Sequence, residues 1–172
     1  MLMSRMEPEN NIEMILDGFH QSNSDKKFLV IGDAKNRFGK YILKKFANDE
    51  RIHFAGSIYN NELTHTLKSL SVLYFHGHSV GGTNPSLLEA MASKALIAAH
   101  DNDFNKAVIQ HNGYYFQSKT DVKELIETIS RSNIGEKMVC NNLKKIKEEF
   151  NPQHIVDEYE NFIVECYKKG KK

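Results

Sequence analysis

The residues best suited to bind a phosphorylated ligand lie in one segment, residues 76–100, which reads HGHSVGGTNPSLLEAMASKALIAAH. Asn84 is a favoured N-cap residue and Pro85 suits the first position of a helix, so a helix is predicted to begin at Pro85. The free N–H groups and the positive dipole end of a helix N-terminus bind anions, phosphate above all. Gly81 and Gly82 precede this helix and permit a positive φ and a close approach of the backbone to a ligand.

Further polar side chains in the segment have a spacing that could serve the same ligand. His76 and His78 are two residues apart at the end of a predicted strand, so both rings point to one face. The sequence offers no Cys or carboxylate spaced to complete a zinc site with them. We therefore expect the two histidines to face a ligand cleft. Glu89 follows Ser86 by three residues, which places both side chains on one helix face near its start.

Two motifs of other enzyme classes fail on spacing. Residues 32–40, GDAKNRFGK, resemble a Walker A loop, but six residues separate the glycines and Tyr41 follows the lysine. A Walker A loop needs four residues there and Ser or Thr after the lysine. The pattern G-x-S-x-G is absent from the sequence, so neither Ser79 nor Ser86 is predicted to act as a hydrolase nucleophile.

The elements that must position these groups alternate along the first part of the chain. Strands are predicted at residues 26–33, 51–56, 71–78, 95–100 and 113–117, and residues 1–4 resemble the end of a further strand. Helices are predicted between the strands, and alternating elements of this kind favour βαβ units with a parallel sheet. The strands lack a regular apolar–polar alternation, as expected when helices cover both faces of the sheet.

Apolar residues at helical spacing mark the faces expected to be buried. These are Ile12, Ile15, Leu16 and Phe19; Phe38, Tyr41, Ile42 and Phe46; Leu63, Leu67 and Leu70; and Ile155, Tyr159, Phe162 and Cys166. We interpret residues 1–172 as one domain, with an α/β core at residues 1–120. Residues 121–172 are predicted to be trailing helices that pack back against the sheet.

The composition excludes several classes of protein. The net charge is +1, from 23 basic and 22 acidic residues, which predicts no nucleic-acid partner. The two cysteines, Cys140 and Cys166, form no C-x-x-C pair, a usage typical of a reducing compartment. No apolar run approaches the roughly 20 residues that span a bilayer, and the N-terminus has no signal-peptide pattern. The chain is therefore expected to be cytoplasmic.

Longer stretches of the sequence resemble one enzyme family. Residues 84–116, NPSLLEAMASKALIAAHDNDFNKAVIQHNGYYF, are similar to the donor-binding half of family 4 (group 1) retaining glycosyltransferases of the GT-B type. Members of that family read P-S-x-x-E-A-M-A-x-G-x-P-V-I-A, then a loop, a short helix and N-G-x-x-F. Similar matches at residues 5–19, 26–33, 51–79 and 151–163 extend the resemblance over almost the whole chain. More narrowly, HGHSVGGTNPSLLEAM and EPENNIEMIL resemble a bacterial rhamnosyltransferase subgroup.

The resemblance implies a fold and a site. The fold is a three-layer, Rossmann-like α/β domain with a parallel sheet, the C-terminal half of a GT-B enzyme. Glu89 matches the second Glu of the family's E-x7-E motif, which holds the ribose of the nucleotide. Gly82, Thr83 and Asn84 match the loop that holds the diphosphate or the donor sugar. Arg5 matches the diphosphate-binding Arg, which stabilises charge on the departing diphosphate and is the expected catalytic residue.

Two positions depart from the family pattern. Gly81 stands where the first Glu of E-x7-E is expected, so the role of that carboxylate is lost or passes to His78 or Asn84. Asn10 stands where the family has a Lys beside the Arg, which removes one positive charge. The expected donor-binding residues are His78, Gly81, Gly82, Thr83, Asn84, Ser86 and Glu89. The nucleobase is expected to be read largely by the backbone near residues 54–56.

The resemblance implies that the intact enzyme moves a sugar from a nucleoside diphosphate sugar to a glycan or lipid-linked acceptor. It implies no metal and no other cofactor, and it allows peripheral association of the full-length enzyme with a membrane. The N-terminal acceptor domain of GT-B enzymes has no counterpart in this chain, which alone is expected to bind donor without turning it over. The changes at Gly81 and Asn10 favour an alternative, a catalytically silent Rossmann-like module that binds a nucleotide or a protein.

Overall fold

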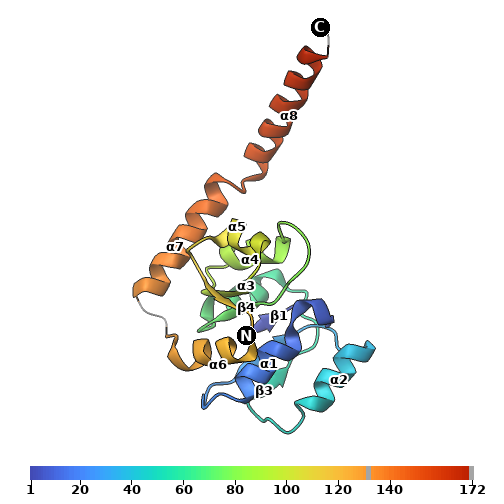
Figure 1. The fold of residues 1–172 in the computed structure, drawn as a ribbon, viewed down its shortest axis with the longest axis vertical. Helices are drawn as coiled ribbons and strands as arrows, with labels where there is room; N and C mark the ends of the chain where they lie inside the picture. Colours follow the sequence, from blue (N-terminus) through green and yellow to red (C-terminus); the bar gives the residue numbers. More distant parts are fainter. Residues whose placement is uncertain (131–132, 171–172) are drawn as a thin grey trace.

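Six parallel strands form a single sheet in the computed structural model, which describes residues 1–130 and 133–170 (Figure 1). The strands are β1 (Leu2–Met3), β2 (Phe28–Ile31), β3 (Ile52–Phe54), β4 (Tyr74–His76), β5 (Ile97–His100) and β6 (Tyr114–Phe116). Their order across the sheet is β3-β2-β1-β4-β5-β6. The predicted parallel α/β sheet is therefore confirmed.

The short strand β1 lies at the centre of the sheet. Leu2 pairs with Val30 of β2 on one side and with Phe75 of β4 on the other. The chain winds outward from β1 to β3 and then crosses back to β4, so the strand order reverses between β1 and β4. In open α/β sheets, ligands bind outside the carboxyl ends of the strands at such a reversal.

Helices cover both faces of this sheet. The helices that the structure describes are α1 (Ile12–His20), α2 (Arg37–Lys45), α3 (Asn61–Leu70), α4 (Pro85–Ala92), α5 (Asp103–Ile109), α6 (Lys119–Thr128), α7 (Asn133–Glu148) and α8 (Pro152–Lys169), with a 3-10 turn, η1, at Pro8–Asn10. One buried cluster joins the sheet to α1, α2 and α6 through Phe19, Ile42 and Val122. A second joins the opposite face to α4 and α5 through Leu87 and Ile109. The three-layer architecture is as predicted.

The predicted buried face of α3 is wrong for two of its three residues, since only Leu67 packs, half-buried, against the core. Leu63 and Leu70 are 45% and 73% exposed, whereas the polar residues Thr64 and Lys68 are buried. The helix contacts the cleft and α4, where the buried Lys68 meets Glu89, whereas the Thr64 hydroxyl donates to the Asn61 carbonyl of the same helix. Of the face expected around α2, Ile42 and Phe46 are buried, Phe38 is half-buried and Tyr41 is exposed.

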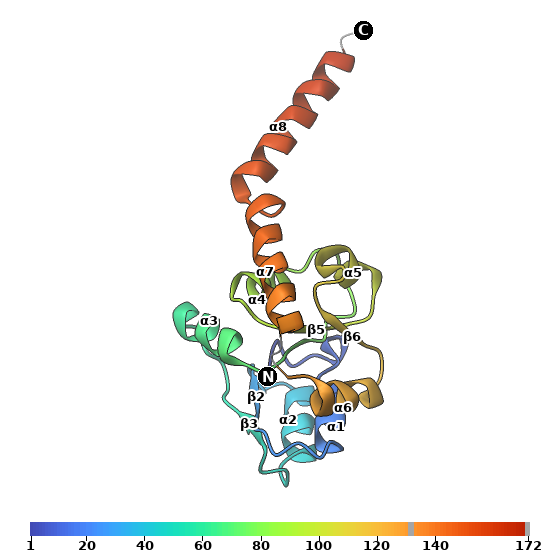
Figure 2. The same cartoon turned by 90° about the vertical axis from the view of Figure 1, so that its left-hand side faces the viewer.

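The trailing helices do not all return to the sheet. Helix α6 packs against α1 and α7 packs against α4, but α8 extends away from the α/β core (Figures 1 and 2). Every side chain that the structure describes on α8 is exposed, including the apolar Tyr159 and Phe162. The expectation that this helix packs back against the sheet is therefore wrong. Among the described helices, none is long and apolar enough to cross a membrane.

A close contact joins the turn after β1 to the end of β4. A Cβ atom at Gly77 would overlap the backbone carbonyl of Asn10, so only glycine fits there without a shift of the backbone. The Asn11 side chain donates to the Gly77 carbonyl (2.8 Å). The backbone N–H and the hydroxyl of Ser79 both donate to the Glu9 carbonyl, at 3.1 and 2.9 Å. These contacts fix the η1 turn against the carboxyl end of β4.

We predict that Gly77→Ala destabilises the fold by about 2 kcal/mol or more, because the added methyl group meets backbone that cannot rotate away. Gly82→Ala is the matched control. Gly82 has no positive φ, and a Cβ there would have no atom within 4 Å, so its effect should stay within about 0.5 kcal/mol. Urea unfolding of both variants measures the difference. Equal stabilities would contradict the tight contact at Gly77.

Candidate functional site

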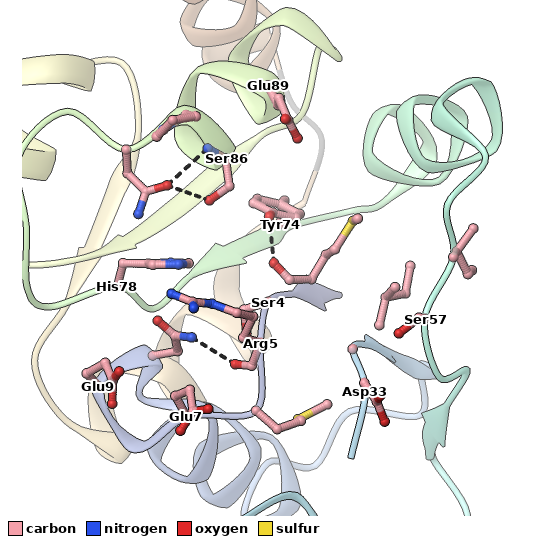
Figure 3. Close-up of a pocket in the computed structure, with 18 of the residues that line it drawn as sticks. Ser4, Arg5, Glu7, Glu9, Asp33, Ser57, Tyr74, His78, Ser86 and Glu89 are labelled. Atoms are coloured by element: carbon pink, nitrogen blue, oxygen red, sulfur yellow. Dashed lines mark hydrogen bonds between the residues drawn. The ribbon is translucent and has the colours of Figure 1, made fainter. Parts of the chain in front are cut away.

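A cleft of about 930 Å³ opens at the carboxyl ends of β1, β2 and β4, where the strand order reverses (Figure 3). The segment after β1, the segment after β2 and the start of α4 form its walls. Its polar lining includes Ser4, Arg5, Glu7, Glu9, Asn10, Asp33, Asn36, Ser57, Lys68, His78, Asn84, Ser86 and Glu89. Five of the predicted site residues thus share one cleft: Arg5, His78, Asn84, Ser86 and Glu89.

Helix α4 begins at Pro85, as predicted. The Asn84 side-chain oxygen caps it, accepting from the backbone N–H of Ser86 (3.0 Å) and from the Ser86 hydroxyl (2.8 Å). The cap occupies that oxygen, so the group that Asn84 can offer a ligand is its amide NH₂. Ser86 lines the cleft, but its hydroxyl proton is directed at Asn84, which makes its hydroxyl primarily part of the cap.

Arg5 is an exposed side chain on a fixed backbone. Its carbonyl oxygen accepts from the Asn10 side-chain amide (2.8 Å) and from the backbone N–H of Glu7 (2.9 Å). Asn10 is almost completely buried, so it brings no charge to the cleft and instead holds the turn that carries Arg5. The guanidinium extends toward His78 in Figure 3.

His76 and His78 stack on one another, with ring centroids 4.5 Å apart and an interplanar angle of 14°. Burial, reinforced by the neighbouring His78, lowers the pKa of His76 to about 3. Burial and the positive charge of Arg5 also lower the pKa of His78, while Glu9 opposes that shift. Both rings are therefore neutral at pH 7. Residues 1–130 and 133–170 contain no cluster of three His, Cys, Asp or Glu side chains able to hold a metal ion.

The loop before α4 differs from the expected cradle. Gly81, Gly82 and Thr83 are exposed and are not among the residues that line the cleft. Gly81 has a φ of +104°, a conformation that L-residues rarely adopt. A glutamate at position 81 would be strained in this loop, so the missing carboxylate is linked to the shape of the backbone.

Several residues that line the cleft were not predicted from the sequence. Asp33 directly follows β2, and Ser57 and Tyr59 follow β3, so the rule that ligands meet strand carboxyl ends could have found them. Ser57 and Tyr59 lie just beyond residues 54–56, where nucleobase recognition was expected. No sequence pattern identified Lys68 as a cleft residue, because the predicted buried face of its helix consisted of leucines. Its ammonium group lies 3.3 Å from a carboxylate oxygen of Glu89.

A family model for "Glycosyl transferases group 1" matches residues 1–150. The chain belongs to this family. No curated protein sequence matches the chain at a significant level.

Solved structures of glycosyltransferases share the fold of this family member. HepE from Anabaena, in complex with UDP-glucose, superposes with a TM-score of 0.81 at 16% identity, over 95% of this chain and 48% of HepE. Sucrose-phosphate synthase from Thermosynechococcus elongatus gives 0.81 at 15% identity, over 98% of this chain and 45% of the synthase. The C-terminal domain of the group 1 protein LpcC from Francisella tularensis gives 0.68 at 18% identity, over 88% and 85% of the two chains. This chain thus spans about half the length of HepE and of the synthase.

The burial of His76 predicts that the fold loses stability in acid. Below the unfolded-state pKa of about 6.5, the unfolded chain binds a proton that the folded chain, with a His76 pKa of about 3, does not bind. Stability should therefore fall as the pH drops, and His76 should account for about 2 kcal/mol of that fall between pH 7 and pH 5.

His76→Phe keeps a flat ring against His78 and should remove that share of the slope in urea unfolding measured at both pH values. His53→Phe, at an exposed position of β3, serves as the control and should leave the slope unchanged. An identical pH dependence in the His76 variant and the wild type would refute the assignment.

Proposed function

We propose that this chain is the donor-binding domain of a glycosyltransferase and that its cleft binds a nucleoside diphosphate sugar. The observation that carries the proposal is the convergence of Arg5, the N-terminus of α4 and Glu89 on one cleft at the strand-order reversal. A cation and a helix N-terminus suit a diphosphate, and a carboxylate suits the vicinal hydroxyls of a ribose. Family membership supports the same reading.

The diphosphate would lie between Arg5 and the start of α4. Arg5 can offer a planar, permanently charged guanidinium from a backbone that Asn10 holds in place. The α4 N-terminus and the Asn84 amide group can offer N–H donors. These groups would stabilise the negative charge that develops on the departing diphosphate, with no metal ion in the step.

Because position 81 is a glycine, the donor sugar must hydrogen-bond to polar groups other than a carboxylate at that position. His78 is neutral and borders the cleft, and the Asn84 amide is available beyond the cap, so both can hydrogen-bond sugar hydroxyls. Glu7 and Glu9 are carboxylates on the same cleft, contributed by the η1 turn instead of the loop before α4. We expect these groups to set the preference for the sugar.

The complete reaction would transfer the sugar, with retention of configuration, to a glycan or lipid-linked acceptor, and a rhamnosyl donor is our narrower expectation. An acceptor-binding domain must contribute to that step. We therefore expect this chain by itself to bind donor nucleotide and not to transfer sugar.

Two observations favour a second candidate, a catalytically silent module that binds a nucleotide or a protein. The backbone at Gly81 disfavours the carboxylate that contacts the donor sugar in the family pattern, and the buried Asn10 replaces a cationic side chain. Both changes weaken the parts of the site that act on the sugar and the leaving group, but neither affects Glu89.

Calorimetric titration with UDP, GDP and dTDP tests nucleotide binding. At least one should bind, and Glu89→Ala should weaken it by tenfold or more, because hydrogen bonds to a charged acceptor contribute about 1.5–3 kcal/mol each. Glu124→Ala, an exposed carboxylate on α6 away from the cleft, is the control and should bind like the wild type. If none of the three nucleotides binds at millimolar concentration, the proposal fails.

Arg5→Ala should distinguish the contribution of the second phosphate to binding from that of the rest of the nucleotide. We expect it to weaken binding of the preferred nucleoside diphosphate by about ten- to hundredfold, and that of the monophosphate by less, because one charge-assisted contact is lost. Arg37→Ala, at the start of α2, removes an exposed arginine that does not line this cleft and should change neither affinity. Equal losses for the monophosphate and the diphosphate would place the second phosphate elsewhere.

A further inference from the structure

Lys68 is a buried cation on the wall of the cleft. It extends from α3 toward α4, and its side chain is 2% exposed, whereas the Glu89 side chain that it meets is 57% exposed. Its ammonium group donates to Glu89 Oε2 at 3.3 Å, the one hydrogen bond that this group makes among the described residues. The pair thus joins an interior charge to a carboxylate that solvent and ligands can reach.

The burial of Lys68 constrains Glu89. A buried ammonium without a partner costs several kcal/mol, so the structure favours arrangements that keep the ion pair closed. Tyr74 lies behind the pair, fully buried; burial and the Glu89 charge raise its pKa, so its hydroxyl stays protonated and donates to the Met3 carbonyl (3.3 Å). Figure 3 shows Glu89 reaching from α4 toward Tyr74 at the edge of the cleft.

An exposed glutamate ordinarily samples several rotamers, and a ligand that needs one of them must overcome that entropy. Here the ion pair engages Oε2 and leaves Oε1 as the oxygen that can accept from a ligand. A carboxylate held in this way is preorganised, which strengthens binding without any new contact to the ligand.

We propose that Lys68 is a positioning residue that holds Glu89 in the orientation that accepts hydrogen bonds from the ribose hydroxyls of the nucleotide. The inference rests on the proposed nucleotide-binding function and adds to it a device that distinguishes ribose from 2′-deoxyribose. Lys68 does not touch the nucleotide; it acts through Glu89.

The test compares ribonucleoside diphosphates with their 2′-deoxy forms, as the pairs UDP and 2′-deoxy-UDP, GDP and 2′-deoxy-GDP, and ADP and 2′-deoxy-ADP. The wild type should bind the preferred ribonucleotide about tenfold or more tighter than its deoxy form, the loss expected for one hydrogen bond to a charged acceptor. Lys68→Met keeps the apolar stem and removes the charge. It should reduce that preference to about threefold or less, weakening the deoxy form, which keeps its 3′-hydroxyl, by a smaller factor than the ribo form.

A structural role for Lys68 gives a different pattern. If Lys68→Met weakens the ribo and deoxy forms by the same factor, or leaves the ribose preference intact, the inference is overturned. In a Glu89→Gln background, Lys68→Met should have no further effect on the preference. Lys40→Met, an exposed lysine on α2, controls for loss of a charge and should bind both forms like the wild type.

Folding is checked by thermal unfolding of each variant. If Lys68→Met does not fold, Lys68→Gln takes its place, because the glutamine amide keeps a hydrogen-bond donor near Glu89. Lys68→Gln should lower the ribose preference below that of the wild type. An unchanged preference would overturn the inference. A wild-type chain that binds nucleotides without discriminating between the sugars would refute the role of Lys68 and leave the proposed function standing. A wild-type chain that binds dTDP and none of the six nucleotides would likewise refute the role of Lys68, and one that binds neither dTDP nor any of the six would refute the proposed function itself.

Discussion

The site depends on the close contact between Gly77 and Asn10. It joins the turn after β1 to the end of β4, the two strands between which the sheet reverses its order. Because no Cβ intervenes, the η1 backbone can lie directly against the end of β4, where the Asn11 side-chain amide donates to the Gly77 carbonyl and Ser79 donates to the Glu9 carbonyl. Arg5 enters the cleft from one side of this contact and His78 from the other. The spacing between these two groups is therefore set by backbone packing, which is stiffer than any side-chain interaction.

The features that sequence predicts best are those governed by neighbours along the chain. The start of α4 at Pro85 follows from the capping preference of Asn84, and the parallel sheet follows from alternating apolar segments. The burial of Lys68 in place of Leu70 could not be predicted in this way. Apolar spacing identifies a face that is capable of burial, but which face is buried depends on what the fold places opposite, and for α3 that is a cleft wall carrying Glu89.

The charged side chains that line the cleft differ in their exposure to solvent. The guanidinium of Arg5 is exposed and available to a ligand, whereas the ammonium of Lys68 is buried and available only to Glu89. Of the two stacked histidines, His76 is buried in β4 and only His78 lines the cleft; His78 is neutral at pH 7, so it contributes hydrogen-bonding capacity and no further positive charge. Positive charge that can act on a ligand is thus supplied by Arg5, by the exposed Lys35 and by the N-terminus of α4. That distribution suits a ligand with a compact anionic centre flanked by neutral hydroxyl-bearing rings.

Helix α8 has consequences for how the chain's stability is measured. The side chains that the structure describes on this helix are exposed, and contacts such as the i,i+4 pair of Lys169 and Glu165 contribute only about 0.3–0.5 kcal/mol. A helix that depends on local interactions opens independently of a packed core, so its amide hydrogens should exchange with solvent long before those of β4 and β5. The chain therefore combines a cooperative α/β unit with a helix whose order is determined locally, and a global unfolding transition reports on the first alone.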